Sequence, residues 1–291
     1  MVIPTHDTRE LALRCVGSLP SNLEIILVDD GSRDGTAEAV SSSFPHVRIL
    51  RNEQAQGFTR SANRGLAESR GEILLLLNSD TEVEPAGIDA LLARFSEQPK
   101  LGIVGATLHY PDGSPQWSGG NEPSLLWLFG LASGLPPLLA KLPLYRRAKP
   151  LVQRSSSWVT GAALAIRRQA LLQAGPLDEQ FRLYAQDLDL CVRVRQAGWE
   201  IEILPEFRVL HHHGATIGAQ ERALGRQNLE LLWTDLLRWA RKNKGESWAS
   251  NARRALLWGV RLRLAGRRFL PARNREEDQL LRKALTTVRS G

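Results

Sequence analysis

The first hundred residues alternate between short apolar runs and segments with helical periodicity. The apolar runs are Val2-Ile3, Glu24–Val28, Val47–Leu50 and Ile73–Leu77. The helical patterns between them cover residues 8–19, 34–43 and 57–69. This alternation is typical of β-α-β units, so it predicts an α/β fold built on a mostly parallel sheet. Ile73–Leu77 is apolar throughout, as expected for a central strand that is buried on both faces.

Length and composition exclude several other classes of protein. The chain has 291 residues, of which 43% are hydrophobic, so it can bury a core and is not disordered throughout. Two cysteines cannot form a disulfide framework, and neither belongs to a C-x-x-C motif. The first residues resemble a strand rather than a secretory signal, and a few residues are expected to be missing upstream of Met1. A reducing, cytoplasmic location is therefore expected.

Polar residues follow three of the predicted strands directly. They are Thr5, Asp29-Asp30 and Asn78-Ser79-Asp80. Taken singly, such residues are equally consistent with ordinary turns and helix caps. Together they favour a ligand site, because open α/β sheets bind ligands at the carboxyl ends of their strands. Carboxylates that converge there can bind a base or ribose and a divalent cation that neutralises a diphosphate.

From about residue 101 the pattern changes to shorter pieces. Tyr110–Gly113 predicts a turn between strands, and Trp158–Arg167 predicts a strand that leads into a helix over 168–174. Residues 177–199 hold the densest polar signal in the chain, including Asp187 and Asp189. On a helix these two lie about 200° apart, so one of them is expected to be structural.

Two further short strands are predicted, over Ile201–Leu204 and Phe207–Leu210, and the second runs into three histidines. Strand alternation puts His211 and His213 on one side and His212 on the other. Neutral imidazole binds divalent cations, but a packed or surface histidine cluster has similar weight on this pattern alone.

The C-terminal part differs from the rest in charge. Residues 220–291 carry 17 Lys and Arg against 7 Asp and Glu, whereas residues 1–219 carry 21 against 24. Four of the eight tryptophans lie in this basic part, namely Trp233, Trp239, Trp248 and Trp258. Helices of this composition suit an anionic membrane surface, with nucleic acid, oligomer contacts or a solvated face as alternatives. The uncharged stretch Pro123–Ala140 contains prolines and glycines, so it predicts a hydrophobic loop or short helical hairpin that touches membrane or lipid rather than a spanning helix.

No single motif in this chain identifies a family, but the motifs taken together and in this order do resemble one. The chain resembles family 2 of the inverting glycosyltransferases over about residues 1–217, and within it the rhamnosyltransferase-type enzymes of bacterial polysaccharide assembly. The motifs that carry it are Val2-Ile-Pro-Thr-His-Asp7, Val28-Asp-Asp-Gly-Ser-Arg-Asp-Gly-Thr36, Asn52 through Gly57 to Asn63, Leu77-Asn-Ser-Asp80, Thr160-Gly-Ala162, Leu177-Asp-Glu-Gln-Phe181, Tyr184-Ala-Gln-Asp-Leu-Asp-Leu-Cys191, Ala197-Gly-Trp199 and His211-His-His-Gly214.

This resemblance implies a GT-A fold and a nucleoside-diphosphate-sugar donor. The Rossmann-like, nucleotide-binding half would span residues 1–100, the acceptor-binding half residues 101–219, and a basic helical tail residues 220–291. By motif position, Thr5 and Asp30 line the nucleoside pocket, where Asp30 accepts hydrogen bonds from a pyrimidine and Asp29 assists. Gly57, Arg60 and Asn63 pack beside the nucleotide, and Arg60 or Arg64 contacts phosphate.

The resemblance also implies a divalent cation, Mg²⁺ or Mn²⁺. Asp80 is the last residue of the family's D-x-D element and would bind the metal. Asn78 stands at the first position of that element and offers a neutral oxygen in place of a second carboxylate. His211 matches the family's downstream metal-binding histidine, with His213 as the substitute if His211 does not reach the site.

The implied catalytic base is Asp187. It matches the second residue of the family's Glu-Asp pair, whose first position is Gln186 here. An inverting transfer needs one carboxylate to take the proton of the acceptor hydroxyl. Losing the adjacent negative charge should lower the pKa of Asp187. Trp158, Gly161 and Ala162 are expected to form the wall beside the donor sugar and the acceptor.

The sequence thus predicts a metal-dependent glycosyltransferase that moves a sugar, with rhamnose suggested by the resemblance, from a UDP- or dTDP-sugar to a glycan or lipid-linked glycan. It would sit peripherally on the inner face of the plasma membrane through its tail, with no nucleic-acid partner. The main alternative is a catalytically silent GT-A-fold binding protein attached to the membrane, which Asn78 and Gln186 favour. A sugar nucleotidyltransferase fits less well, because Pro4–Asp7 is not a glycine-rich phosphate loop.

Overall fold

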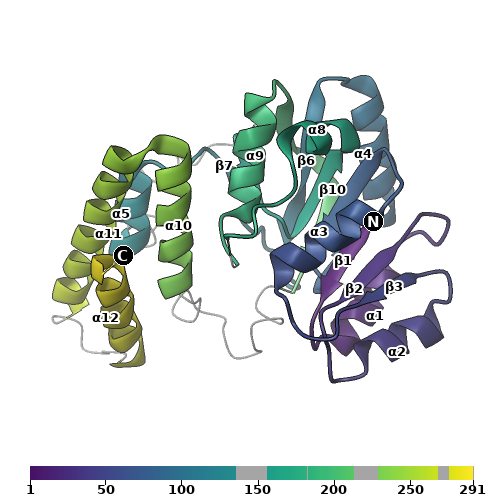
Figure 1. Cartoon of the computed structure of the whole chain (residues 1–291), viewed down its shortest axis with the longest axis horizontal. Coiled ribbons are helices and arrows are strands. Elements are labelled where there is room, and N and C mark those ends of the chain that lie inside the picture. The colour runs from purple at the N-terminus through teal and green to yellow at the C-terminus, as the bar shows by residue number, and fades with distance from the viewer. Residues whose placement is uncertain (136–155, 182, 213–228, 268–274, 291) are drawn as a thin grey trace. The chain divides into compact units, whose positions relative to one another are not determined.

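The computed structural model describes residues 1–135, 156–181, 183–212, 229–267 and 275–290 (Figure 1). The chain divides into two compact units. The first, here the sheet unit, comprises residues 1–121 and 153–220. The second, the helical unit, comprises residues 122–152 and 221–291. The described residues 122–135 therefore group with the C-terminal helices, whereas residues 101–121 and 156–212 belong to the sheet unit.

The sheet unit is built on an eight-stranded mixed sheet with the order β3-β2-β1-β4-β9-β6-β10-β5. Four neighbouring pairs are parallel, and the pairs that involve β9 or β5 are antiparallel. The strands are β1 (Val2–Thr5), β2 (Ile26–Asp29), β3 (Arg48–Arg51), β4 (Ile73–Leu77), β5 (Thr81–Val83), β6 (Leu101–His109), β9 (Ala163–Arg167) and β10 (Glu200–His211). A separate two-stranded sheet pairs β7 (Gly119–Gly120) with β8 (Trp158–Val159).

Helices connect and cover these strands. In the sheet unit they are α1 (Arg9–Gly17), α2 (Thr36–Ser43), α3 (Phe58–Glu68), α4 (Pro85–Glu97), α8 (Arg168–Ala174) and α9 (Gln186–Gln196). Helix α3 packs on β1 and β2, and Gly65 permits this approach, since a Cβ atom there would lie 2.9 Å from Val28 Cγ2. The core on the sheet is aliphatic and includes Ile3, Leu27, Leu77 and Val104, which are all buried.

The α/β expectation for the first hundred residues is confirmed, and the second half needs corrections. Trp158–Arg167 is not one strand, because residues 160–162 form a turn between β8 and β9. The two strands expected over residues 201–210 are one strand, β10, whose register with β6 shifts between Leu204 and Arg208. The short strand β5 directly follows Asp80 and was not expected from the pattern.

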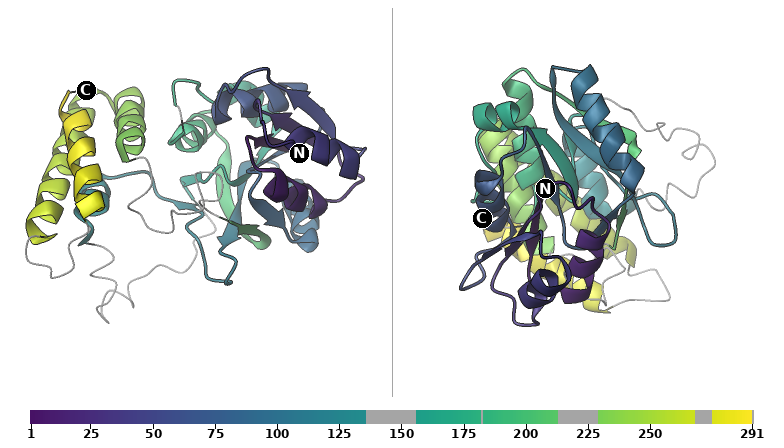
Figure 2. Two further views of the ribbon diagram at one scale, coloured as in Figure 1. Left: turned by 90° about the horizontal axis from the view of Figure 1, so that it is seen from below. Right: turned by 90° about the vertical axis from the view of Figure 1, so that its right-hand side faces the viewer.

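The helical unit consists of α5 (Leu125–Ser133), α10 (Leu229–Lys244), α11 (Glu246–Arg267) and α12 (Arg275–Ser290). Helices α10, α11 and α12 pack on one another, as the views of Figure 2 show, and α5 packs on α11. Gly259 of α11 allows α5 to approach closely, because a Cβ atom at this position would lie 2.7 Å from Ala132 Cβ. Of the predicted apolar stretch Pro123–Ala140, residues 125–133 are thus a helix within this unit, and residues 136–140 lie outside the described residues.

None of the helices in the described ranges is both long enough and apolar enough to cross a membrane.

Candidate active site

The polar ends of β1, β2 and β4 lie side by side, because these strands are neighbours in parallel register. Thr5 pairs with Asp29 in the ladder, and the Asp30 N–H donates to the Thr5 carbonyl at 2.8 Å. A chain of hydroxyl groups then crosses from β1 to the end of β4. The Oγ1 atoms of Thr5 and Thr8 are 2.6 Å apart, and Thr8 Oγ1 lies 3.0 Å from Ser79 Oγ. The structure therefore gathers Thr5, Asp29 and Ser79 at one edge of the sheet.

The carboxylate of Asp30 anchors the loop between β3 and α3. It accepts hydrogen bonds from Asn52 Nδ2 (2.7 Å), the Gln56 N–H (2.9 Å) and the Gly57 N–H (2.8 Å). Gly57 has φ 94°, a backbone conformation that favours glycine. Burial alone would raise the pKa of Asp30, but these hydrogen bonds outweigh it and lower the pKa. Asp30 is therefore a buried, charged acceptor that shapes this loop.

Asp29 is fully buried below this loop. Its Oδ1 accepts from the Ser32 N–H at 3.2 Å, and its Oδ2 lies 3.2 Å from Arg51 Nε. The contacts of Asp29 therefore stabilise the turn after β2 and fix the Arg51 side chain.

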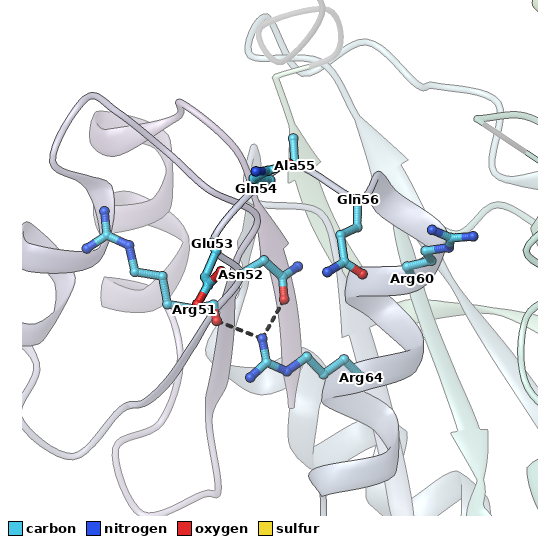
Figure 3. A pocket seen from close by; sticks show the side chains of 8 residues that line it. All are labelled: Arg51, Asn52, Glu53, Gln54, Ala55, Gln56, Arg60 and Arg64. Carbon is cyan, nitrogen blue, oxygen red and sulfur yellow. Dashed lines mark hydrogen bonds between the residues drawn. The ribbon is translucent and has the colours of Figure 1, made fainter.

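A cavity of about 510 Å³ lies along the β3–α3 loop (Figure 3). Its lining residues are Arg51, Asn52, Glu53, Gln54, Ala55, Gln56, Arg60 and Arg64. Three arginines and one glutamate line it, but Arg51 pairs with Asp29 and Glu38, and Arg60 pairs with Glu179, so carboxylates already offset much of its positive charge. Figure 3 shows Arg64 directed at the Arg51 carbonyl, to which its Nη1 donates at 2.8 Å, and at the side-chain oxygen of Asn52.

One face of α3 holds the segment 177–181, which precedes α9. Asn63 uses both ends of its amide on the Leu177 backbone, with Nδ2 donating to the carbonyl at 2.8 Å and Oδ1 accepting from the N–H at 2.9 Å. Arg60 Nε lies 3.0 Å from Glu179 Oε2, and Thr59 Oγ1 donates to the Phe181 carbonyl at 3.0 Å. The structure thus directs Asn63 and Arg60 to this segment, whereas the sequence predicted that they contact the donor.

The Asn63→Ala variant tests which role holds. We expect unchanged nucleotide affinity and an acceptor kcat/KM lower by up to about 30-fold, since two hydrogen bonds of about 1 kcal/mol each are lost from the segment that leads to Asp187. Isothermal titration with nucleotide and steady-state kinetics with acceptor measure the two effects. Weaker nucleotide binding at an unchanged acceptor kcat/KM would instead support a direct donor contact.

Asp80 and His211 meet where β4 leads into β5. The end of β10 pairs with β5, with His211 opposite Thr81, and this brings His211 Nε2 to 3.3 Å from Asp80 Oδ1. Both side chains are buried. His213 lies outside the described residues, and among the described residues no group of three or more His, Cys, Asp or Glu side chains is arranged to hold a metal.

Gln116, a residue outside all the sequence motifs, orients the His211 ring. Its Nε2 donates to the His211 carbonyl at 2.6 Å, so its Oε1 is the atom that faces His211 Nδ1, at 2.9 Å. An amide oxygen only accepts, so Nδ1 carries a proton and Nε2 is the ring nitrogen that faces the Asp80 carboxylate. Imidazole nitrogen and carboxylate oxygen are both ligands of divalent cations, so this pair fits a divalent metal, with Gln116 as the outer hydrogen-bond partner.

Replacing Gln116 with methionine should weaken Mn²⁺ binding about tenfold, because the ring is no longer held in the tautomer that binds metal through Nε2. Titration with Mn²⁺ alone, followed by electron paramagnetic resonance, measures this without any substrate. Ser118→Ala is the control, since Ser118 Oγ accepts from the Leu108 N–H at 2.9 Å and lies 3.4 Å from the Gln116 backbone carbonyl, so this change leaves the Gln116 amide in place. Equal affinities for the wild type and Gln116→Met would contradict the assignment.

Asp187 lies in the first turn of α9. Its Oδ2 accepts from the Gly161 N–H and its Oδ1 from the Leu188 N–H, both at 2.8 Å. Burial raises the pKa of Asp187, although these N–H donors act in the opposite sense. Asp189 points elsewhere and binds Arg193 Nε at 2.8 Å, in keeping with the expectation that one of the two aspartates is structural. The neighbouring Gln186 is also buried.

Residues 160–162 connect the end of β4 to the start of α9. The Gly161 N–H binds Asp187, and the Ala162 carbonyl accepts from the Asn78 N–H at 2.9 Å. Trp158, just before this turn, is buried and donates from Nε1 to the Asn121 carbonyl at 3.1 Å. Its ring meets that of Trp117 edge to face at 4.9 Å, and Trp117 is largely exposed. Trp117 was not predicted, because its neighbour Trp158 is 41 positions away in the chain.

Comparison with known proteins decides the family. The family model described as Glycosyl transferase family 2 matches residues 1–174. The chain belongs to glycosyl transferase family 2. A relative of this family 2 member in Mycobacterium tuberculosis is N-acetylglucosaminyl-diphospho-decaprenol L-rhamnosyltransferase, 34% identical over 212 residues that cover 67% of this chain and 68% of the relative.

A second relative of this family 2 chain is the O-antigen biosynthesis protein RfbC of Myxococcus xanthus. It is 27% identical over 228 residues, which cover 74% of this chain and 17% of RfbC. Together with the mycobacterial relative, it places the chain in the rhamnosyltransferase-like branch of the family, as the sequence motifs predicted.

Solved structures confirm the GT-A fold of this glycosyltransferase. GalNAc-T7, crystallised with UDP, GalNAc and Mn²⁺, has a TM-score of 0.61 at 17% identity, over 99% of this chain and 55% of that chain. The mannosyltransferase PcManGT from Pyrobaculum calidifontis, in complex with GDP-Man and Mn²⁺, has a TM-score of 0.58 at 14% identity, over 99% of this chain and 83% of that chain.

Proposed function

We propose that this family 2 glycosyltransferase moves a sugar such as rhamnose from a UDP- or dTDP-sugar to a hydroxyl group of a lipid-linked glycan precursor of the cell envelope, with inversion at the anomeric carbon. One observation carries the proposal: the turn over residues 160–162 holds Asp187 next to the end of β4, where Asp80 meets His211. A base and a candidate metal pair are therefore positioned by one short segment.

Asp187 is the proposed catalytic base. As the acceptor oxygen attacks the anomeric carbon, its proton passes to the Asp187 carboxylate, and the bond between that carbon and the diphosphate breaks on the opposite side. The N–H donors of Gly161 and Leu188 orient the carboxylate and leave its remaining lone pairs for the acceptor hydroxyl. Trp158 and Ala162 form the neighbouring acceptor wall in this proposal.

Asp80 and His211 would hold a divalent cation, Mg²⁺ or Mn²⁺, and Asn78 would add a neutral oxygen at the end of the same strand. When bound, such a cation offsets the negative charge that grows on the leaving diphosphate. Thr5, Asp29, Asp30 and Gly57 would form the nucleoside side of the donor site, with Arg60 among the residues that line the neighbouring cavity.

The mycobacterial relative supports the proposed acceptor class, because its name gives a decaprenol-diphosphate-linked sugar as acceptor and rhamnose as the sugar transferred. Such acceptors are embedded in a bilayer, so we place the protein peripherally on the inner face of the plasma membrane, in contact with anionic lipid through its C-terminal helices. We propose no nucleic-acid partner, since no motif of a nucleic-acid-binding module accompanies the basic C-terminal part.

A thermal-shift panel with UDP, dTDP, GDP and their sugars, with and without Mn²⁺, tests the donor class. A ligand at 100 times its Kd adds about 2.7 kcal/mol, which is readily measured. We expect a metal-dependent shift with one pyrimidine nucleotide, followed by transfer to a polyprenyl-diphosphate-sugar acceptor. Nucleotide binding with neither transfer nor donor hydrolysis would favour the silent binding protein, and binding of GDP alone would overturn the donor class.

A further inference from the structure

Helix α11 of the helical unit has one apolar face inside the unit and another that is exposed. Leu256 and Val260 are fully buried, whereas the exposed fractions of Trp258 and Leu262 are 63% and 46%. An exposed tryptophan of this size is unusual on a polar helix surface.

Trp258 lies at the centre of a chemically mixed surface. At about 100° per residue, positions 254, 258, 261 and 262 follow the i, i+4, i+7, i+8 pattern of one helix face. Arg254 and Arg261 are both exposed, and the Arg261 guanidinium carbon lies 5.2 Å from the centre of the Trp258 ring. We name Arg254, Trp258, Arg261 and Leu262 the Trp258 face.

After Glu246, the charged residues of helix α11 are all positive. From Ser247 to Arg267 the helix contains five arginines and no aspartate or glutamate. Arg267 is paired with Asp278 of α12 at 2.8 Å, at the far end of the helix from Glu246. The Trp258 face therefore combines arginine with exposed apolar side chains and carries no negative charge from its own helix.

We propose that the Trp258 face binds the interfacial region of an anionic phospholipid bilayer. Tryptophan and leucine enter the headgroup–acyl boundary there, while the arginines extend to phosphate groups. Binding to the phosphate backbone of a nucleic acid would account for the exposed arginines, but it would not account for the exposed apolar side chain of Leu262. The inference assigns membrane contact to one of the four C-terminal tryptophans, because Trp233 and Trp239 are buried within the helical unit and Trp248 packs against the Trp239 ring.

The Trp258 face belongs to the helical unit, whereas Asp187, Asp80 and His211 belong to the sheet unit. The proposal therefore rests on the membrane placement in the proposed function and not on its transfer chemistry. The Trp258 face also differs from a transmembrane anchor, since a peripheral face should release the protein when salt screens the arginines.

Vesicle sedimentation of the full chain tests the proposal, with phosphatidylglycerol–phosphatidylcholine vesicles and with phosphatidylcholine alone. We expect binding to the anionic vesicles only, weakened at least tenfold both by Arg254→Glu with Arg261→Glu and by Trp258→Ser with Leu262→Ser. The matched control replaces an exposed leucine and an exposed lysine of the sheet unit, Leu172→Ser with Lys100→Glu, and should bind like the wild type.

Brominated lipid gives a second readout. It should quench tryptophan fluorescence in the wild type, and Trp258→Phe should lose most of that quenching while keeping the melting temperature and the nucleotide affinity of the wild type. Equal vesicle binding by the wild type and both double variants would overturn the proposal. So would binding of a DNA or RNA duplex through Arg254 and Arg261 without any binding to vesicles. Loss of sugar transfer with intact vesicle binding would count against the proposed function alone.

Discussion

Replacing Asp187 by asparagine should lower kcat for sugar transfer about 10³-fold while the affinity for the donor nucleotide stays within threefold of the wild type. General bases contribute roughly 10²–10⁴-fold, and asparagine keeps the size of the side chain and an oxygen that can accept from the Gly161 N–H. Single-turnover transfer measures the first quantity and nucleotide titration the second.

Asp189→Asn is the matched control on the same helix. Asp189 is fully buried and paired with Arg193, so this variant should lower the melting temperature and leave kcat close to that of the wild type. Asp187→Asn should lose little stability at neutral pH: it gives up the hydrogen bond from the Leu188 N–H, but it also removes a carboxyl whose pKa is raised by burial and which is therefore destabilising once it is ionised. Donor binding and transfer lost together in Asp187→Asn would contradict its assignment as the base.

The pH profile should show the same carboxyl. The base works in its ionised form, so kcat/KM should rise with pH as Asp187 loses its proton. Because burial raises the pKa of Asp187, this rise should lie above the ordinary aspartate pKa of about 4. The Gln186→Glu variant places a second carboxylate beside it and should move this limb to still higher pH, since a like charge disfavours ionisation. A limb that does not move would show that Asp187 is not the group that titrates.

The second large effect is expected at the candidate metal pair. Asp80→Asn should reduce Mn²⁺ affinity and lower kcat by about 10²–10³-fold. Without the bound cation, nothing would offset the negative charge that grows on the leaving diphosphate. The fold should tolerate the change, because asparagine has the size of aspartate and its amide can hydrogen-bond to His211 Nε2 in place of the carboxylate. Mn²⁺ titration, melting temperature and transfer kinetics together separate these effects.

The control for Asp80 lies two residues away. Glu82 Oε1 forms a similar pair with His212 Nε2, at 2.7 Å, and this pair is not the one that Asp80 makes with His211. Glu82→Gln should therefore leave Mn²⁺ affinity and kcat within twofold of the wild type. If Glu82→Gln matched Asp80→Asn in its loss of Mn²⁺, the metal could not be assigned to Asp80 and His211 alone.

The sequence predicted the parts of this protein that depend on local pattern. The strand ends at Thr5, Asp29 and Asp80 follow from apolar runs that stop abruptly, and the split between Asp187 and Asp189 follows from helical geometry. The motif order predicted the family. Each of these signals lies within a few residues of the feature that it predicts.

Features that depend on distant parts of the chain could not be predicted in the same way. Gln116 meets His211 across 95 positions, and nothing in its immediate neighbours marks it as a histidine partner. Asn63 and Arg60 were assigned to the donor because their motif lies beside it, but their side chains reach a segment more than 110 residues further along the chain. The burial of Trp233 and Trp239 also depends on how the helices pack, whereas composition treated all four tryptophans alike.

The turn over residues 160–162 limits how this enzyme can be recombined with its relatives. Its backbone bonds to Asn78 at the end of β4 on one side and to Asp187 on the other. A chimaera that joins residues 1–100 to the second half of another transferase would take Asn78 from one parent and the 160–162 turn with Asp187 from the other. The two hydrogen bonds that align these parts would then join residues of different parents. Exchange of donor specificity should succeed when the Asn78 strand end and the 160–162 turn come from the same parent.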